Sequence, residues 1–344
     1  MNRLSTLGIL LACAVGCSAP PTPDVPWTEQ LLVDAPEGMT DAVDCLVVAP
    51  DAPDLVYVAG NAGEQHLEAQ PVHPFFLSSD DGGRSWRSQQ PALGSRTVTT
   101  LGVGATRDGQ RTLFAGSGAG LHRSRDGGQS WEDLSDGLPG EFQAFALSVL
   151  PGPGERVVAV DFSGAVFCSE DAGATWTRGA GARGLPAALA ADANRALLLT
   201  DEGLFQSADG GRSWQQLADC AGVPGYAAIA LSPADPAQIL VVAKLPDGSS
   251  QVLRSVDRGA TWAPVPGSEG AQDVEVDPAD PQRLYVLNEH EGASVWRTRD
   301  GGATWEPLGA VSGAWELVLG GGRLYALDRL SRRLHVLELK QLAD

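Results

Sequence analysis

The sequence predicts an all-β protein, and three observations support this prediction. One eight-residue pattern, S/T-x-D-x-G-x-S/T-W, recurs six times, with its aspartate at positions 81, 126, 171, 209, 257 and 300. The segments between the copies contain short aliphatic and β-branched runs of strand length. No segment shows a sustained helical period of apolar residues. The spacing of the aspartates, 38 to 48 residues, fits a repeating unit of four strands.

Each unit reads as four strands in a fixed order. In the sixth unit, Val274–Val276 is followed by an Asp/Pro-rich turn and then by the aliphatic run Arg283–Leu287. A third strand leads into the octapeptide, which forms the turn to a fourth strand starting at its tryptophan. The first unit repeats this order with Leu46–Val48 and Leu55–Val58. These alternating runs and turns are typical of antiparallel β-structure.

The two ends of the chain complement each other. Residues 314–319, 323–327 and 333–339 supply three strands without an octapeptide, whereas residues 27–33 begin with a tryptophan, like a fourth strand. Together they complete a seventh unit. The sequence therefore predicts a seven-bladed β-propeller of four-stranded blades over residues 27–344, closed by its N-terminal strand so that no sheet edge stays open.

The octapeptide is suited to clasping a hairpin. Its aspartate can accept backbone N–H bonds across a tight turn, its glycine can adopt a positive φ, and its tryptophan can cover the strand edge. We predict a structural role for these residues, which are Asp81, Asp126, Asp171, Asp209, Asp257, Asp300, Gly83, Gly128, Gly173, Gly211, Gly259, Gly302, Trp86, Trp131, Trp176, Trp214, Trp262 and Trp305.

The octapeptide resembles the Asp-box, or BNR, repeat of sialidase-like, sortilin-like and photosystem-assembly-factor-like propellers, and the resemblance covers residues 27–344. It implies that the boxes lie at the blade periphery, away from the ligand face. Sialidases carry an arginine triad whose first member lies in an Arg-Ile-Pro-like motif before the first box. Here Arg3 is the only arginine before Arg84, so catalytic residues of that kind are not expected. Photosystem-type assembly factors match best in size, but they carry an Arg-rich patch, whereas this chain is acidic.

Charge and cysteine content exclude other classes. The chain has 24 Lys and Arg against 43 Asp and Glu, a net charge of −19, which argues against nucleic-acid binding. No CxxC spacing or Cys/His cluster is present, so neither a metal site nor a cofactor is expected. By alignment of the repeats, Cys45 and His122 are expected to be buried, while Cys168 falls in a more polar position. Cys168 and Cys220 are expected at opposite ends of their blades, so a disulfide between them is not predicted.

The N-terminus predicts export. The apolar run Leu4–Val15 is too short to span a bilayer but suits a signal peptide over residues 1–16. The small residues before Cys17 resemble a bacterial lipobox, so Cys17 is expected to carry a lipid, with residues 17–26 as a Pro-rich tether. Cys13 is a competing lipidation site, and a plain secretory signal is the alternative to both. The expected location is the outer membrane or the cell surface.

One sector offers candidate interaction residues. The loop over residues 61–74 breaks the repeat by its length, and acidic and histidine residues in blades six, seven and one would be neighbours around a closed ring. The candidates are Glu64, His66, His73, Asp273, Glu289, His290, Glu291 and Glu316. Three interpretations stay open: a solvated acidic rim, a cation or polar-ligand site, and a patch for a protein partner.

Together these features favour a non-catalytic, envelope-anchored scaffold for protein interaction or assembly. We expect it to be a monomer that contacts the membrane only through its lipid and binds an envelope protein. The alternative is a glycan-directed propeller, either a sialidase-like hydrolase or a lectin.

Overall fold

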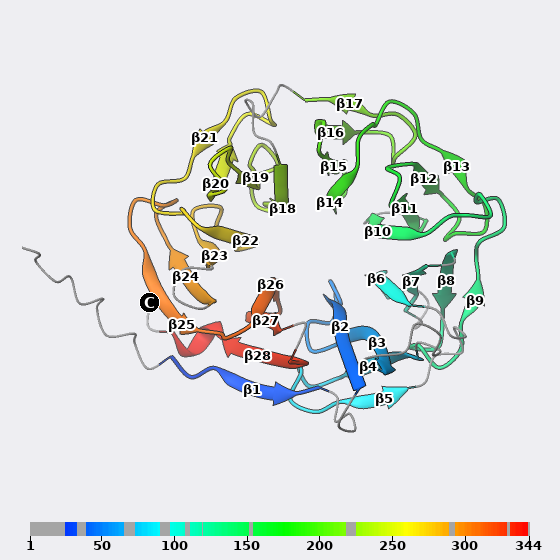
Figure 1. Ribbon diagram of the computed structural model, residues 1–344, viewed down its shortest axis with the longest axis horizontal. Helices are drawn as coiled ribbons and strands as arrows, with labels where there is room; N and C mark the ends of the chain where they lie inside the picture. The colour runs from blue at the N-terminus through cyan, green and yellow to red at the C-terminus, as the bar shows by residue number, and fades with distance from the viewer. Residues whose placement is uncertain are drawn as a thin grey trace, which may run out of the picture.

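The computed structural model of this 344-residue chain is a ring of seven four-stranded antiparallel sheets (Figure 1). The structure describes residues 25–32, 39–64, 73–89, 97–106, 111–118, 120–150, 154–217, 225–288, 293–328 and 331–342. The prediction of an all-β seven-bladed propeller is confirmed. Within each of blades 1 to 6, strands follow one another outward in chain order, so the first strand of every blade lines the centre of the ring.

The blades have the following strands. Blade 1 contains β2 (Met39–Val48), β3 (Val56–Glu64), β4 (His73–Ser79) and β5 (Arg87–Gln89); blade 2 contains β6 (Val98–Val103), β7 (Leu113–Ser117), β8 (Gly120–Ser124) and β9 (Glu132–Asp133). Blade 3 contains β10 (Ala144–Leu150), β11 (Arg156–Asp161), β12 (Val166–Ser169) and β13 (Thr177–Arg178); blade 4 contains β14 (Pro186–Ala191), β15 (Ala196–Thr200), β16 (Gly203–Ser207) and β17 (Gln215–Gln216). Blade 5 contains β18 (Gly225–Leu231), β19 (Ile239–Lys244), β20 (Ser250–Ser255) and β21 (Ala263–Pro264); blade 6 contains β22 (Ala271–Val276), β23 (Leu284–Asn288), β24 (Ser294–Thr298) and β25 (Glu306–Ala310). Blade 7 contains β26 (Ala314–Gly320), β27 (Arg323–Asp328) and β28 (Arg333–Glu338), with β1 (Thr28–Leu31) as its outer strand, and a short 3-10 helix, η1 (Leu339–Gln341), follows.

The N-terminal strand closes the ring, as predicted. β1 pairs antiparallel with β28, from Thr28 opposite Val336 to Leu31 opposite Arg333. The indole Nε1 of Trp27 donates a hydrogen bond to the carbonyl of Leu308 in β25, at 2.6 Å, so this segment also joins blade 7 to blade 6. Non-covalent closure leaves the last blade with a complete set of strands.

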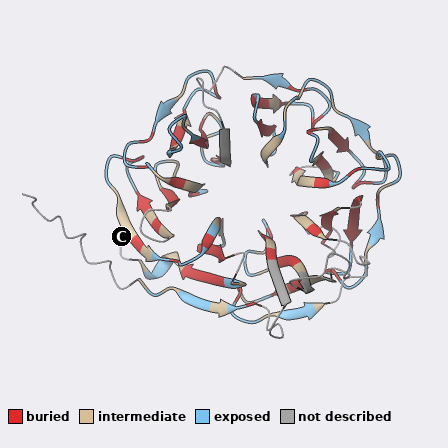
Figure 2. Ribbon diagram, in the orientation of Figure 1, coloured by how far each residue is buried: buried red, intermediate tan, exposed pale blue. Residues whose placement is uncertain are grey.

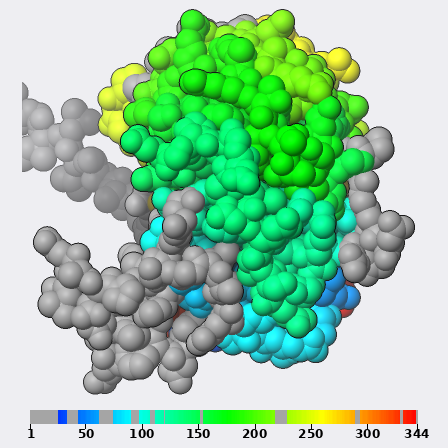
Figure 3. All heavy atoms as spheres, turned by 90° about the vertical axis from the view of Figure 1, so that its right-hand side faces the viewer, coloured from blue at the N-terminus to red at the C-terminus, as the bar shows by residue number. Residues whose placement is uncertain are grey.

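The hydrophobic core lies between neighbouring blades. The second strands β7, β15 and β27 are buried along their whole length, whereas the outer strands β9, β13, β17 and β21 are exposed. Figure 2 shows this gradient, and the view of blades 2 to 4 in Figure 3 shows their closely packed outer side. At the closure, Tyr325 and Leu334 of blade 7 pack with Val56 and Val58 of blade 1. Burial of apolar surface at each such interface holds the ring together.

Each of the six boxes closes with the same hydrogen bonds. The hydroxyl of the first Ser or Thr donates to the box aspartate at 2.8 Å. It also accepts the N–H of the box glycine at 2.7–2.9 Å. The same aspartate accepts the N–H of the second Ser or Thr at 2.8–2.9 Å. The box therefore satisfies the backbone donors of a turn that would otherwise leave them unpaired.

The box backbone has two successive residues at positive φ, one more than the octapeptide pattern itself reveals. The box glycines have φ between 85° and 101°, and the residues before them have φ between 58° and 77°. Four of these preceding residues are glycines, but Ala172 and Arg258 are not, with φ of 58° and 63°. A left-handed backbone costs a residue with a Cβ roughly 1–2 kcal/mol.

Buried and half-buried arginines join consecutive blades near the boxes. Arg123 of blade 2 donates to the carbonyl of Ala172 in the box of blade 3 at 2.6 Å. Arg254 of blade 5 makes the equivalent bond to Gly301 of blade 6 at 3.2 Å. Arg323 of blade 7 pairs with Asp54 of blade 1 at 2.8 Å. These three arginines thus contribute to the contacts between neighbouring blades.

The described cysteines are both buried. Cys45 is 9% exposed, as the alignment of repeats predicted. Cys168, for which the alignment predicted a more polar position, is 3% exposed and packs with Val158, Leu198 and Phe205 between blades 3 and 4. This burial raises the pKa of its thiol, and the charges of Arg212, Asp209 and Glu170 also act on it. Cys220 and residues 1–24 lie outside the described residues.

Candidate functional site

The first strand of every blade contains a bulge at the same place. Its pairing with the second strand skips one residue, four or five residues before the end of the first strand. The skipped residues are Asp44, Thr99, Phe145, Ala187, Ala227, Gln272 and Trp315. A bulge redirects the side chains beside it. Because all seven first strands line the ring, the bulges form a circle around one mouth of the central channel. On this face of the ring the second strand of each blade turns into the third strand, and we call it the loop face. The boxes, which connect third strands to fourth strands, lie on the opposite face.

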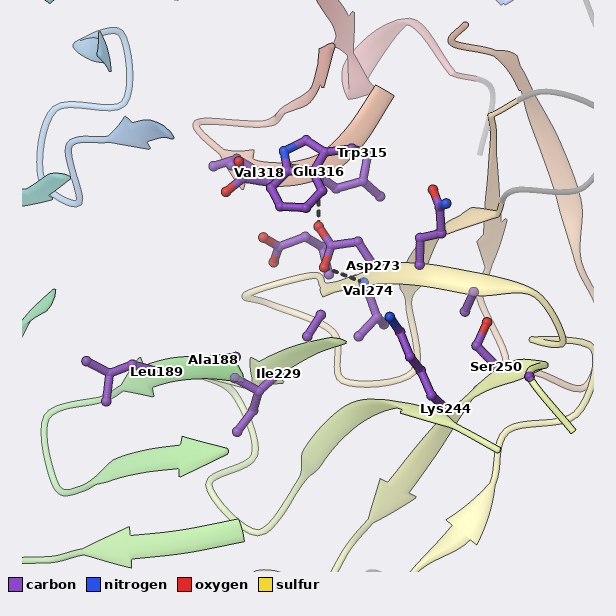
Figure 4. A pocket seen from close by; sticks show the side chains of 16 residues that line it. Ala188, Leu189, Ile229, Lys244, Ser250, Asp273, Val274, Trp315, Glu316 and Val318 are labelled. Carbon is purple, nitrogen blue, oxygen red and sulfur yellow. Dashed lines mark hydrogen bonds between the residues drawn. The ribbon is translucent and has the colours of Figure 1, made fainter. Parts of the chain in front are cut away.

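A cavity of about 530 Å³ lies at this mouth, along the first strands of blades 4 to 7 (Figure 4). Blades 4 and 5 contribute an apolar side, formed by residues such as Leu189 and Ile229. Blades 6 and 7 contribute Asp273, Glu275 and Glu316, and the second strand of blade 5 contributes Lys244. The cavity is therefore apolar on one side and acidic on the other.

Two carboxylates of β22 bridge blades 6 and 7. Asp273 accepts the N–H of Leu317 in β26 at 2.7 Å and the N–H of Val274 at 2.8 Å. Glu275 accepts hydrogen bonds from the backbone of Leu319 and of Val276. The innermost strand of a blade is a sheet edge with unpaired N–H groups, and these two carboxylates satisfy that edge of β26.

These carboxyl groups hold their protons unusually strongly. Burial raises the pKa of Asp273 to about 7, against the backbone hydrogen bonds that lower it. Burial, followed by the repulsion of Asp273, also raises the pKa of Glu275 well above its usual value, and Glu316 adds further repulsion. Both side chains keep some contact with the channel, but four blades surround them, so water solvates their charges poorly. Titratable groups perturbed in this way and placed in a cavity are often functional.

Trp315 is the exposed aromatic residue of this site. It is 51% exposed, although large aromatic side chains are usually mostly buried. Trp315 and Asp273 both line the cavity, and Glu316 follows Trp315 in β26 (Figure 4). Strict alternation would send Trp315 and Glu316 to opposite faces of the strand, but the pairing skips Trp315, and both residues line the cavity.

A second aromatic group lies on the loop face at blade 3. Phe145, the bulge residue of that blade, packs edge-on against Phe162 with ring centroids 5.3 Å apart. Phe162 is 51% exposed, and Leu185 at the start of blade 4 is 59% exposed. The turn after Phe162 lies against the chain before Leu185, since a Cβ on Gly164 would come within 2.1 Å of the carbonyl of Gly184. This face thus has apolar contact points beyond the cavity.

The structure brings together two of the eight candidate residues from the sequence, Asp273 and Glu316, in this cavity. Glu64 and His73 lie at the ends of β3 and β4, and nothing is described of their side chains. His66, Glu289, His290 and Glu291 lie outside the described residues. The sequence interpretation missed Glu275, Trp315 and Lys244. A signal for Glu275 was present, because Asp273 and Glu275 alternate in a first strand whose counterpart in blade 5 has alanines, Ala228 and Ala230.

Two searches of the described ranges were negative. Among these residues, no three His, Cys, Asp or Glu side chains are grouped in a way that could hold a metal ion. No helix within them is both long enough and apolar enough to span a membrane.

Comparisons with known proteins show the fold and leave the family open. No family model matches the chain. It is 27% identical over 218 residues to a xyloglucanase of a Paenibacillus species, and 27% identical over 236 residues to a xyloglucanase of Hypocrea jecorina. These matches cover 58% and 64% of this chain but only 20% and 25% of the relatives, so the chain matches a quarter or less of their length.

Two solved structures with similar rings contain bound peptides. YCF48 bound to a D1 peptide superimposes with a TM-score of 0.67 at 14% identity, covering 94% of this chain and 99% of that one. Chaetomium thermophilum Sqt1 bound to the N-terminus of ribosomal protein L10 superimposes with a TM-score of 0.56 at 15% identity, covering 87% and 97%. At these identities the likeness supports the propeller fold alone.

Proposed function

We propose that this protein is a non-catalytic scaffold that binds a peptide segment of a partner protein at the loop-face mouth of its channel. The observation that carries the proposal is the cavity of about 530 Å³ beside the half-exposed Trp315. Its size lies within the range of roughly 300–1,000 Å³ that is typical of ligand sites. An exposed tryptophan is also among the residue types that contribute most to protein interfaces.

Two further observations support a peptide rather than a small metabolite. The cavity is continuous with a ring mouth, and Phe162 and Leu185 provide exposed apolar contacts on blades 3 and 4 of the same face. A segment of several residues can reach such separate points, whereas a small molecule cannot. Structural neighbours with similar rings bind peptides of other proteins.

The envelope location is part of this proposal. It is supported by the apolar run Leu4–Val15, the lipobox-like residues before Cys17 and the Pro-rich stretch after it. Mass spectrometry of the mature N-terminus tests it: a lipid on Cys17 is the expected result. A mature chain that starts unmodified after Cys17 would contradict the anchor.

Site-specific photo-crosslinking tests the binding face. A benzophenone amino acid at Gln272, which lines the cavity, should crosslink a partner protein when the chain is expressed in its own cells. The control is the same amino acid at Val256, which is 61% exposed in the box of blade 5 on the other face. Crosslinks from Val256 to the same partner, with none from Gln272, would refute this choice of face.

A glycan-directed function is the second candidate, and two observations favour it. The relatives found by sequence are xyloglucanases. The cavity places Asp273, with a pKa of about 7, near an exposed indole, and a carboxyl that is protonated near neutral pH can act as a general acid. Incubation with xyloglucan oligosaccharides and with fluorogenic glucosides and sialosides separates the two functions. Turnover that Asp273→Asn abolishes would establish an enzyme, and no turnover is the result that the scaffold predicts.

A further inference from the structure

We propose that the cavity is a receptor for a cationic side chain, an arginine or lysine of the bound segment, which pairs with Asp273 and Glu316 and lies against the indole of Trp315. This inference rests on the proposed function and specifies what the bound segment must contain.

The shape and lining of the cavity carry the first step. Asp273, Glu275 and Glu316 come from adjacent first strands, and together they give one side of the cavity three carboxyl groups. Trp315 lies at the same side, with about half of its surface open to solvent. An aromatic face next to carboxylates is the arrangement that recognises guanidinium and ammonium groups, because both the ring face and the carboxylates attract the cation.

The charge balance inside the cavity carries the second step. The charges of Asp273 and Glu316 both disfavour the ionised form of Glu275, and among the cavity-lining residues only Lys244 carries a positive charge. Each carboxylate oxygen can accept more than one hydrogen bond, so the two backbone bonds of Asp273 leave capacity for a further donor. A ligand cation would relieve this repulsion, whereas an anionic ligand would increase it.

The apolar side of the cavity carries the third step. Leu189 and Ile229 lie opposite the carboxylates, and Ala188 and Ala228 beside them leave room for a long side chain. Arginine and lysine have an aliphatic stem and a charged end, so one side chain can satisfy both sides at once. A small hydrated metal ion would not use the apolar side or the indole.

The pH dependence of binding follows from the same groups. Glu316 of β26 and Lys244 of β19 line the same cavity as Asp273 and Glu275 of β22. Burial raises the pKa of Asp273 to about 7, so this group becomes a full anion only above neutral pH. Affinity for a cation should therefore rise between pH 6 and pH 8, by up to about tenfold for each pKa unit by which binding lowers the pKa of Asp273.

A matched peptide pair tests the proposal with the full-length protein. The probes are two fluorescein-labelled heptapeptides. One has a central arginine flanked by leucines and glycines. The other has citrulline in place of the arginine, which keeps the shape of arginine but not its charge. Fluorescence anisotropy should show tighter binding of the arginine peptide by about tenfold or more at pH 8. The double variant Asp273→Asn/Glu316→Gln should remove this preference, and Trp315→Ala should weaken it. Glu316→Gln alone, which leaves the hydrogen bonds of Asp273 in place, should reduce it in part.

The control is the double variant Asp80→Asn/Glu170→Gln, which makes the same change in net charge in two boxes of the opposite face. It should bind both peptides like the wild type, and thermal unfolding checks that every variant is folded. Equal affinity for the two peptides, no saturable binding of the arginine peptide, or an equal loss in the control would each overturn the inference. If this happens while Gln272 still crosslinks a partner, cation recognition fails and the scaffold function stands.

Discussion

At the scale of single residues, the box aspartates determine how the fold responds to acid. Hydroxyl and backbone N–H donors lower the pKa of Asp257 and of Asp300 to about 2. The folded state therefore keeps these groups ionised while the unfolded chain takes up protons. The stability they contribute is complete above the ordinary aspartate pKa of about 4 and is lost as the pH falls toward 2.

Replacing one of these aspartates should therefore have a pH-dependent effect. Asp300→Asn should lower the melting temperature at pH 7, and the difference from wild type should shrink as the pH falls from 4 to 2. Thermal melts over this pH series measure it, with Asp136→Asn, an exposed aspartate outside the boxes, as the control. A difference that stays constant down to pH 2 would show that the carboxylate charge is not what the clasp uses.

Arg258 provides a second residue-scale prediction. It is exposed and has a φ of 63°, in a position where four of the other boxes have glycine. Arg258→Gly should relieve the left-handed strain and stabilise the protein by about 1 kcal/mol, or roughly 2 °C in melting temperature. The reverse test is Gly210→Ala, at φ 77°, which should destabilise it by a similar amount. If Arg258→Gly lowers the melting temperature, another contact of this side chain matters more than the strain.

The octapeptide pattern was enough to predict the structural roles of its fixed positions. It did not predict that the residue before the box glycine also has a positive φ. Ala172 and Arg258 give no hint of it, because neither residue type favours that backbone. Burial of Cys168 was missed for a related reason. Its counterparts, Arg123, Gln206 and Arg254, are polar in sequence, yet Arg123 is 5% exposed because it bonds to the next blade.

At the scale of elements, β1 is the strand on which closure depends. Leu32, directly after β1, is 7% exposed and packs into the interface between blades 7 and 1. Leu32→Ala should destabilise the protein by about 2–5 kcal/mol, the usual cost of removing a buried leucine side chain. Denaturant unfolding measures this, and Leu31→Ala is the matched control because Leu31 is 55% exposed. Equal effects at both positions would contradict the closure described here.

The strands themselves could be predicted, because each has a clear apolar run and the unpaired ends of the chain add up to one blade. The bulges in the first strands could not, since a bulge changes the register without changing the local pattern of apolar residues. Trp315 and Gln272 were missed for this reason. Both residues line the cavity at the points where the pairing skips one residue.

At the scale of the whole molecule, the cavity is a product of the ring. Its lining comes from four consecutive blades, and residues as distant in sequence as Leu189 and Trp315 share it. Asp273 and Glu316 could be placed near each other from the repeats alone, because they occupy corresponding strands of adjacent blades. Lys244 and the apolar side could not, since their position depends on the width of the channel.

The central claim is that a partner segment with a positive charge binds in this cavity. The most direct measurement is crosslinking from Gln272 in the full-length protein, followed by mass spectrometry of the crosslinked peptide. The claim predicts a single partner protein, linked through a segment that contains an arginine or lysine within a few residues of the crosslink, and loss of this product in Asp273→Asn/Glu316→Gln but not in Asp80→Asn/Glu170→Gln. A crosslinked segment without basic residues, or a product that persists unchanged in the cavity variant, would contradict it.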